Sequence, residues 1–118
     1  MSPEKLGQHF LTDASWQERI ARAVRIDDGA IINTNAGVDH DCWIGNGAHI
    51  GPGSALAGNV IVGCEAFLGI GSSVLPGARI GNRATIGAGS VVLRDIPDDT
   101  TAVGVPARAV SDIAAPPI

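Results

Sequence analysis

A histidine between two aspartates is the residue combination in this sequence best suited to chemistry. It lies in the run NTNAGVDHDC, residues 33–42, where Asp39 and Asp41 flank His40. A carboxylate bonded to one ring nitrogen leaves the other able to accept a proton, and an ordinary histidine, with a pKa of about 6.5, suits a general base near neutrality. The same run is also typical of a solvated corner whose polar residues only form a turn. Both interpretations remain open at this point.

Two further features have residue types that could contact a ligand. His49 follows nine residues after His40, and triplets that contain glycine occupy residues 57–59, 69–71 and 87–89. Corners of this kind expose backbone N–H and C=O groups to an elongated ligand. A lone histidine on a turn is more often an ordinary surface residue, and such triplets also serve as plain turns.

A strict hexad period indicates which elements position these side chains. Twelve aliphatic residues recur without a gap, and a small residue follows nearly every one of them after four places. A hexad suits a short strand plus a turn, so three repeats would close a triangular coil of parallel strands. The pattern predicts an all-β parallel β-helix of about four coils, with His40 and His49 on different sides of it. The aliphatic series is Ile26, Ile32, Val38, Ile44, Ile50, Leu56, Val62, Leu68, Val74, Ile80, Ile86 and Val92.

The period divides the chain into three segments. Residues 26–97 form the β-helix, and residues 98–118 are expected to be an extended tail after a turn at Pro97. In residues 1–25 the apolar spacing and a capping box predict a helix from about Asp13 to Val24. Such a helix would cap the first coil, because an open solenoid end would otherwise template aggregation.

Composition excludes several classes of protein. The 118 residues allow one domain, and a net charge of −4 with a pI near 5.1 argues against nucleic-acid binding. No apolar run approaches the length of a membrane span, and the N-terminus does not resemble a signal peptide. Cys42 and Cys64 form no CxxC pattern, so we expect reduced thiols in a cytoplasmic protein without membrane or nucleic-acid partners.

Four motifs are more specific than the hexads. INTNAGVDHDCWIG, LAGNVIVG, FLGIGSSVLPG and GVPAR, spread over roughly residues 26–110, resemble hexapeptide-repeat sugar N-acetyltransferases of the bacillosamine and perosamine type. Their sialic acid O-acetyltransferase relatives share these motifs. The resemblance implies a left-handed β-helix, acetyl-CoA as cosubstrate, a nucleotide-linked amino sugar as acceptor, and a homotrimer with active sites between subunits.

The resemblance also implies roles for the residues of the acetyl-transfer centre. His40 would be the general base and Asp41 would orient it. Asn33 would lie beside the acceptor amine, and His49 would line the acetyl-CoA site. Gly58 would offer its N–H to the thioester carbonyl, as an oxyanion donor should.

Three more residues would hold the rest of the cosubstrate, by the same resemblance. Ile70 and Ala88 would contact the pantetheine arm through backbone atoms, and Arg108 would meet a phosphate. No metal is expected, because His40 and His49 would need a third ligand and His9 lies outside the repeat.

The segment before the hexads, residues 1–25, resembles a different family. KLGQHFLTDASWQERIARAV is similar to the N-terminus of small-subunit ribosomal RNA adenine dimethyltransferases, but the donor-binding loop and catalytic motif of those enzymes do not follow. We therefore expect a leader joined to a β-helix and acting as its cap. We also expect no sugar-nucleotide domain of the kind that the N-acetyltransferases have, so a non-catalytic trimeric scaffold stands as the alternative function.

Overall fold

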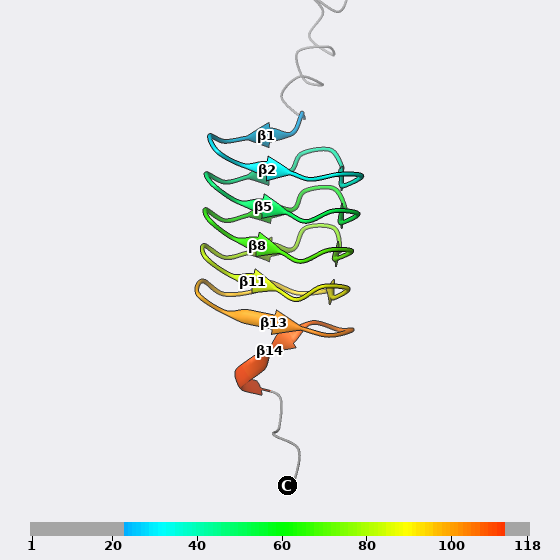
Figure 1. Cartoon of the computed structure of the whole chain (residues 1–118), viewed down its shortest axis with the longest axis vertical. Helices are drawn as coiled ribbons and strands as arrows, with labels where there is room; N and C mark the ends of the chain where they lie inside the picture. Colours follow the sequence, from blue (N-terminus) through cyan, green and yellow to red (C-terminus); the bar gives the residue numbers. More distant parts are fainter. Residues whose placement is uncertain (1–22, 113–118) are drawn as a thin grey trace, which may run out of the picture.

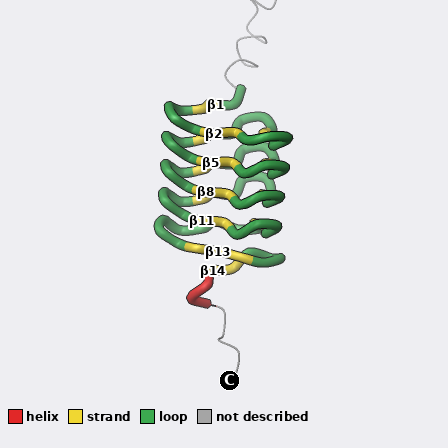
Figure 2. The backbone as a smooth tube through the Cα atoms, in the orientation of Figure 1, coloured by secondary structure: helices red, strands yellow, loops and turns green. Residues whose placement is uncertain are grey.

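The computed structural model describes residues 23–112, which form a stack of triangular coils (Figure 1). The strands of each face follow one another along the stack, and turns connect the strands around each coil (Figure 2). The predicted N-terminal helix lies outside the described residues except for Ala23 and Val24, which are not helical. Within residues 23–112 no helix is long and apolar enough to cross a membrane.

Three sheets form the sides of the stack. Sheet A contains β1 (Arg25–Ile26), β4 (Trp43–Ile44), β7 (Ile61–Val62) and β10 (Arg79–Ile80). Sheet B contains β2 (Ile31–Ile32), β5 (His49–Ile50), β8 (Phe67–Leu68), β11 (Thr85–Ile86), β13 (Thr101–Val103) and β14 (Arg108–Ala109). Sheet C contains β3 (Gly37–Val38), β6 (Ala55–Leu56), β9 (Ser73–Val74) and β12 (Val91–Val92). Strands β1 to β12 make four coils, which confirms the predicted solenoid.

Two of the corners between the sheets contain predicted site residues. Corner BC is the turn from sheet B to sheet C, and corner CA is the turn from sheet C to the next strand of sheet A. Corner BC comprises residues 33–36, 51–54, 69–72 and 87–90. Corner CA comprises residues 39–42, 57–60, 75–78 and 93–95.

The core consists of the hexad aliphatics, as predicted. Parallel pairing places each strand beside the strand one coil later, for example Ile26 beside Ile44 and Ile32 beside Ile50. From β4 to β12 the second residue of every strand is buried, while the first faces outward. Ile26 in the first coil is 51% exposed. The fold is thus the β-solenoid expected of a left-handed hexapeptide-repeat β-helix.

Small residues and left-handed backbone conformations close the corners. Asp41 and Asn59 adopt φ of 59° and 62°, a region that asparagine and aspartate tolerate better than most residues. The small residues that follow the aliphatics are mostly buried, and where they are serines the hydroxyl has a partner. Ser72 Oγ donates to the carbonyl of Gly69 at 2.7 Å, which satisfies a polar group inside the core.

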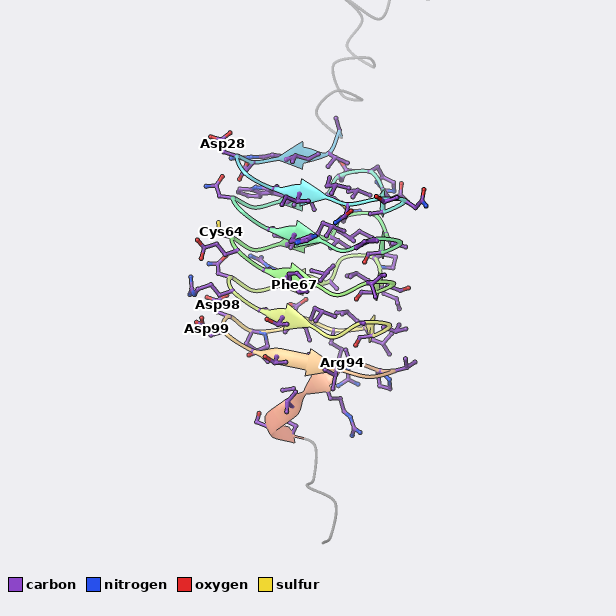
Figure 3. The ribbon with its side chains drawn as sticks, viewed as in Figure 1. Asp28, Cys64, Phe67, Arg94, Asp98 and Asp99 are labelled. Atoms are coloured by element: carbon purple, nitrogen blue, oxygen red, sulfur yellow. The ribbon has the colours of Figure 1, made fainter. Side chains whose placement is uncertain are left out.

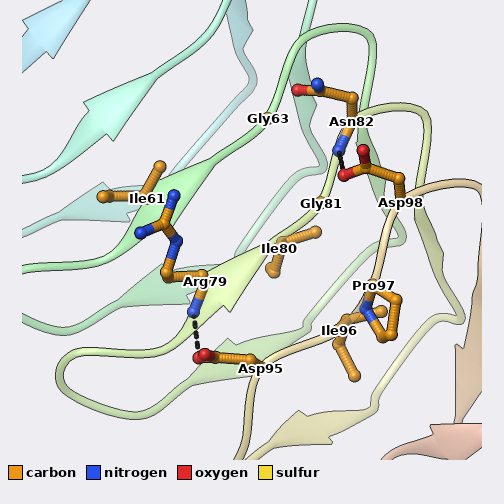
Figure 4. Close-up of a pocket in the computed structure, with 10 residues that line it drawn as sticks. All are labelled: Ile61, Gly63, Arg79, Ile80, Gly81, Asn82, Asp95, Ile96, Pro97 and Asp98. Atoms are coloured by element: carbon orange, nitrogen blue, oxygen red, sulfur yellow. Dashed lines mark hydrogen bonds between the residues drawn. The ribbon is translucent and has the colours of Figure 1, made fainter.

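The regular period ends after Val92. Ile96 bridges Ile80, where the regular register would place Asp98, so the last corner CA is shorter than the others. The side chain of Asp95 replaces the lost backbone acceptor, because its Oδ1 accepts the Arg79 N–H at 2.9 Å (Figure 4). The shortened coil therefore keeps its ladder hydrogen bond.

The C-terminal segment adds a partial fifth coil. Strand β13 pairs parallel to β11, and β14 then pairs antiparallel to β13 before the 3-10 helix η1 (Val110–Asp112). The tail expected to begin at residue 98 is therefore folded onto the solenoid as far as Asp112. Residues 113–118 lie outside the described part of the chain.

Candidate active site

His40 and Asp41 form a hydrogen-bonded pair on corner CA. His40 Nδ1 lies 2.9 Å from Asp41 Oδ2, and the His40 backbone N–H donates to Asp39 Oδ1 at 2.8 Å. A carboxylate only accepts, so Nδ1 carries a proton and the lone pair of the neutral ring is on Nε2. The His40 side chain is 61% exposed. Asp41 thus fixes the tautomer of a largely exposed ring, with the basic lone pair on Nε2.

Gly58 lies directly against the imidazole of His40, one coil further along the same corner. A Cβ added at Gly58 would be 2.5 Å from His40 Cε1 and 2.6 Å from Nε2, which is closer than real atoms approach. The Asn59 N–H also donates to the His40 carbonyl at 3.0 Å. Glycine at this position therefore allows the ring to lie flat against the corner, a steric reason that the sequence did not reveal.

Cys42 is the nearest thiol in sequence to this pair, but it is a poor nucleophile. It is 2% exposed, its Sγ–H donates to the carbonyl of Ala57 at 3.2 Å, and burial raises the pKa of the thiol. The thiolate is the reactive form of cysteine, so this environment favours direct transfer over an acyl intermediate on Cys42.

Asn33 and His49 contact each other near corner BC, which sheet C separates from the corner that carries His40 and Asp41. Asn33 Nδ2 lies 3.2 Å from His49 Nε2, and Asn33 Oδ1 accepts the Thr34 backbone N–H at 2.7 Å. The ring of Phe67, directly below His49 in sheet B, meets it edge-on at 5.0 Å. Sequence reasoning missed Phe67, although it holds the same place as His49 in the following coil and so had to lie on the neighbouring strand.

Ile70 and Ala88 occupy the same corner as Asn33. The Gly89 N–H donates to the Ile70 carbonyl at 2.8 Å, so the two residues follow one another along corner BC. Both side chains are exposed, Ile70 by 60%. Corner BC and the adjoining edge of sheet B thus present Asn33, His49, Ile70 and Ala88 along one edge of the solenoid.

Arg108 is paired in space with a residue that sequence reasoning missed. Arg94 and Arg108, with Leu93 and Pro106, line a hollow of about 190 Å³ at the C-terminal end, and Figure 3 labels Arg94 in this region. Two arginines that border one hollow can together bind an anion such as a phosphate.

The hollow drawn in Figure 4 does not include any of the predicted site residues. It measures about 400 Å³ on sheet A and is bordered by Arg79, Asn82, Asp95 and Asp98. Its polar groups hydrogen-bond to one another, since the Asn82 N–H donates to Asp98 Oδ1 at 2.7 Å. We attribute this hollow to the shortened corner.

Sheet A also has a fixed cluster around Trp43. The guanidinium of Arg25 lies 4.1 Å from the ring centroid, and the indole N–H donates to Asp27 Oδ2 at 2.8 Å. The indole N–H and Arg25 together lower the pKa of the Asp27 carboxyl. Among residues 23–112, no three histidine, cysteine or acidic residues are grouped so that they could hold a metal ion.

The sequence matches a known family along most of its length. The model described as "Bacterial transferase hexapeptide (six repeats)" matches residues 23–58 and 59–94. The chain therefore belongs to the bacterial transferase hexapeptide family.

Solved structures narrow the similarity to acetyltransferases. PerB from Caulobacter crescentus, in complex with CoA and GDP-perosamine, is 57% identical over 73% of this chain, with a TM-score of 0.73. The acetyltransferase domain of PglB from Neisseria gonorrhoeae, in complex with acetyl coenzyme A, is 41% identical over 75% of this chain, with a TM-score of 0.74. Serine acetyltransferase from Neisseria gonorrhoeae is 35% identical over 75% of this chain, with a TM-score of 0.71.

These similarities concern only part of each relative. The chain spans 42% of the PerB chain, 43% of the PglB domain chain and 39% of the serine acetyltransferase chain. No curated protein sequence matches the chain significantly.

Proposed function

We propose that this protein is an acetyl-CoA-dependent acetyltransferase that acts on the amino group of a nucleotide-linked sugar. The observation that carries the proposal is the pair of His40 Nδ1 and Asp41 Oδ2, 2.9 Å apart on an exposed corner. The complexes of PerB with CoA and GDP-perosamine and of the PglB domain with acetyl coenzyme A support the substrate classes.

The proposed reaction is direct transfer. The acceptor amine attacks the thioester carbonyl carbon, and His40 Nε2 takes the proton that the amine loses as the C–N bond forms. The C–S bond then breaks, and the leaving thiolate takes that proton back from the imidazolium to give coenzyme A and the N-acetyl product. Asp41 holds the ring and stabilises its protonated form. In this scheme the Gly58 N–H stabilises the oxyanion.

The other proposed contacts hold acetyl-CoA. His49 lies beside the acetyl group, backbone atoms of Ile70 and Ala88 contact the pantetheine arm, and Arg108 contacts a phosphate. Arg94 is a natural partner for Arg108, because both line the same hollow. Asn33, on the same edge as His49, would lie beside the acceptor amine.

The proposed residues lie on two different edges of one chain, which points to a homotrimer. His40 and Gly58 are on corner CA, whereas Asn33 and His49 are at corner BC, with sheet C between them. A three-fold assembly packed through sheet C would bring corner CA of one copy to corner BC of the next. Support comes from the outward residues of sheet C, which are small or medium-sized: Gly37, Ala55, Ser73 and Val91. Exposed apolar side chains flank this face: Ile70, Leu75 and Leu93.

Thiol release from acetyl-CoA tests the activity. We expect release that depends on a nucleotide-linked amino sugar, and its loss in His40→Ala with little change in thermal stability, because the His40 side chain is largely exposed. Asn46→Ala is the matched control, since Asn46 holds the same exposed corner position one repeat later. A folded protein that binds acetyl-CoA but releases no thiol with any acceptor would support the scaffold instead.

Mixing two variants, each lacking a different histidine of the proposed site, tests whether the site is shared. His40→Ala and His49→Ala chains, unfolded together and refolded as mixed trimers, should recover activity, because about a quarter of the sites then combine an intact His40 with an intact His49 from a neighbouring copy. Each variant refolded alone is the control. Mixed trimers that stay inactive would place both histidines in a site within one chain, or remove one of them from the site.

A further inference from the structure

The orientation of the Asn33 side chain is fixed by its own backbone. The Thr34 N–H is 2.7 Å from the Asn33 side-chain atom assigned as Oδ1. A backbone N–H only donates, so that atom must be the oxygen and the other must be the NH2 group. The NH2 group is therefore the one that faces His49 Nε2 at 3.2 Å.

This orientation determines where the proton of His49 is. An amide NH2 has hydrogens to donate and no lone pair to offer, so Nε2 must be the acceptor. A ring protonated at both nitrogens, or at Nε2 alone, would place two donors against each other. We infer that Asn33 fixes His49 as the neutral tautomer with its proton on Nδ1.

Packing in sheet B holds the ring in place for this contact. His49 pairs with Ile31 on one side and Phe67 on the other. The Phe67 ring is 5.0 Å away with an interplanar angle of 79°, an edge-to-face arrangement. Asn33 fixes one ring nitrogen and Phe67 supports the ring, so rotation of the imidazole would break both contacts.

The consequence is a division of roles between the two histidines, which rests on the proposed function. His40 has its proton on Nδ1 because of Asp41 and accepts a proton on Nε2. His49 has Nε2 engaged by Asn33 and can only donate, through Nδ1–H. The chemical group that fits a neutral donor in an acetyl-CoA site is a carbonyl oxygen, of the thioester or of the pantetheine amides. Asn33 is then a positioning residue that acts through His49, in addition to any contact with the acceptor.

Nitrogen-15 NMR of the full chain tests the tautomer without requiring activity. The sequence has three histidines, so labelling histidine alone gives three ring systems, assigned with His9→Gln and His40→Gln. In the wild type at neutral pH we expect His49 Nε2 to have the shift of an unprotonated nitrogen and Nδ1 that of a protonated one. Asn33→Asp, which replaces the donor with an acceptor of the same shape, should exchange the two signals. Asn35→Asp makes the same charge change on a nearby exposed turn and should leave them unchanged.

The NMR and kinetic results can each contradict a different part of the inference about His49. A protonated Nε2 in the wild type, or a His49 tautomer that does not respond to Asn33→Asp, would overturn it. In thiol-release assays Asn33→Asp should lower kcat/KM for acetyl-CoA by roughly tenfold, since one hydrogen bond is replaced by a repulsive contact. An unchanged kcat/KM would refute the donor role of His49. If the wild type releases no thiol at all, the proposed function fails, and the NMR result on the tautomer is unaffected.

Discussion

Replacing Gly58 with alanine perturbs the His40 ring while leaving the backbone compatible with the new side chain. The added Cβ would lie 2.5 Å from His40 Cε1 and 2.6 Å from Nε2. Gly58 does not have the positive φ that disfavours a side chain, in contrast to Gly53 and Gly71. The substitution therefore forces the imidazole to move, and a movement large enough to relieve the contact separates Nδ1 from Asp41.

The expected effects on activity and on stability differ in sign. A positioned general base contributes roughly 10²- to 10⁴-fold to a rate, so we expect kcat to fall about a hundredfold when the ring is displaced. The ring is exposed, so it can move without disturbing the core. An alanine in a compatible backbone removes freedom from the unfolded chain, and the free energy of unfolding should stay the same or rise by about 0.5 kcal/mol.

The assay combines thiol release with denaturant unfolding on Gly58→Ala, His40→Ala and the double variant. Alanine keeps the backbone N–H of residue 58, so the substitution acts only through the His40 ring, and the double variant should be no less active than His40→Ala. A kcat of Gly58→Ala within threefold of the wild type would refute the steric reasoning. Additive losses in the double variant would show instead that the added methyl group also disturbs something other than the His40 ring, such as the position of the residue 58 N–H in the proposed oxyanion contact.

Three further predictions concern the scaffold. Cys42 should resist alkylation in the folded protein and react after unfolding, because burial covers it and raises the pKa of its thiol; a thiol count with and without denaturant measures this. Ile50→Ala should cost about 2–5 kcal/mol in denaturant unfolding, since Ile50 is fully buried in the second coil. The guanidinium of Arg83 lowers the pKa of Asp99 below 3.8, so the stability from this pair is present above that value and is lost as the pH falls through the lowered pKa. Arg83→Ala should therefore reduce the drop in Tm between about pH 5 and pH 2.

The solenoid could be predicted because the hexad pattern that produces it repeats along the chain. An aliphatic residue such as Ile44, placed once in every hexad, can point inward only if each short strand turns through one side of a triangle. Buried small residues, for example Ala48 and Ser72, allow each corner to close. Twelve agreeing repeats leave little choice of fold, so local reasoning was enough for residues 25–92.

The C-terminal coil could not be predicted, because it depends on one side chain that replaces one lost backbone hydrogen-bond acceptor. The shortened corner after Val92 would leave the Arg79 N–H without a partner, and one aspartate side chain, Asp95, supplies the acceptor. The sequence LRDIPDD does not show which aspartate accepts a hydrogen bond from the neighbouring coil and which one forms a turn. The antiparallel pairing of β14 (Arg108–Ala109) likewise depends on the end of the stack rather than on any repeat.

The two contacts of the candidate site also differ in how far the sequence predicts them. His40 and Asp41 are adjacent in the chain, so their contact was visible in the sequence. Asn33 and His49 are far apart in the chain, and their contact depends on the pairing of β2 (Ile31–Ile32) with β5 (His49–Ile50). The repeat of three hexads per coil is enough to predict that pairing. It does not say that Thr34 turns the amide of Asn33 toward His49.

The geometry of the solenoid explains why its chemistry would require more than one copy. Each outward side chain stays on its own face or corner for the whole length of the stack, because every coil repeats the same path. A base on corner CA and a donor beside corner BC therefore remain separated by sheet C, whatever their positions along the axis. Adding coils cannot bring the base and the donor together, whereas a neighbouring copy packed against sheet C in a three-fold assembly can. A reaction that uses both His40 and His49 would thus make the subunit interface part of the active site, and selection on catalysis would then act on the outward face of sheet C as well as on the residues that contact substrate.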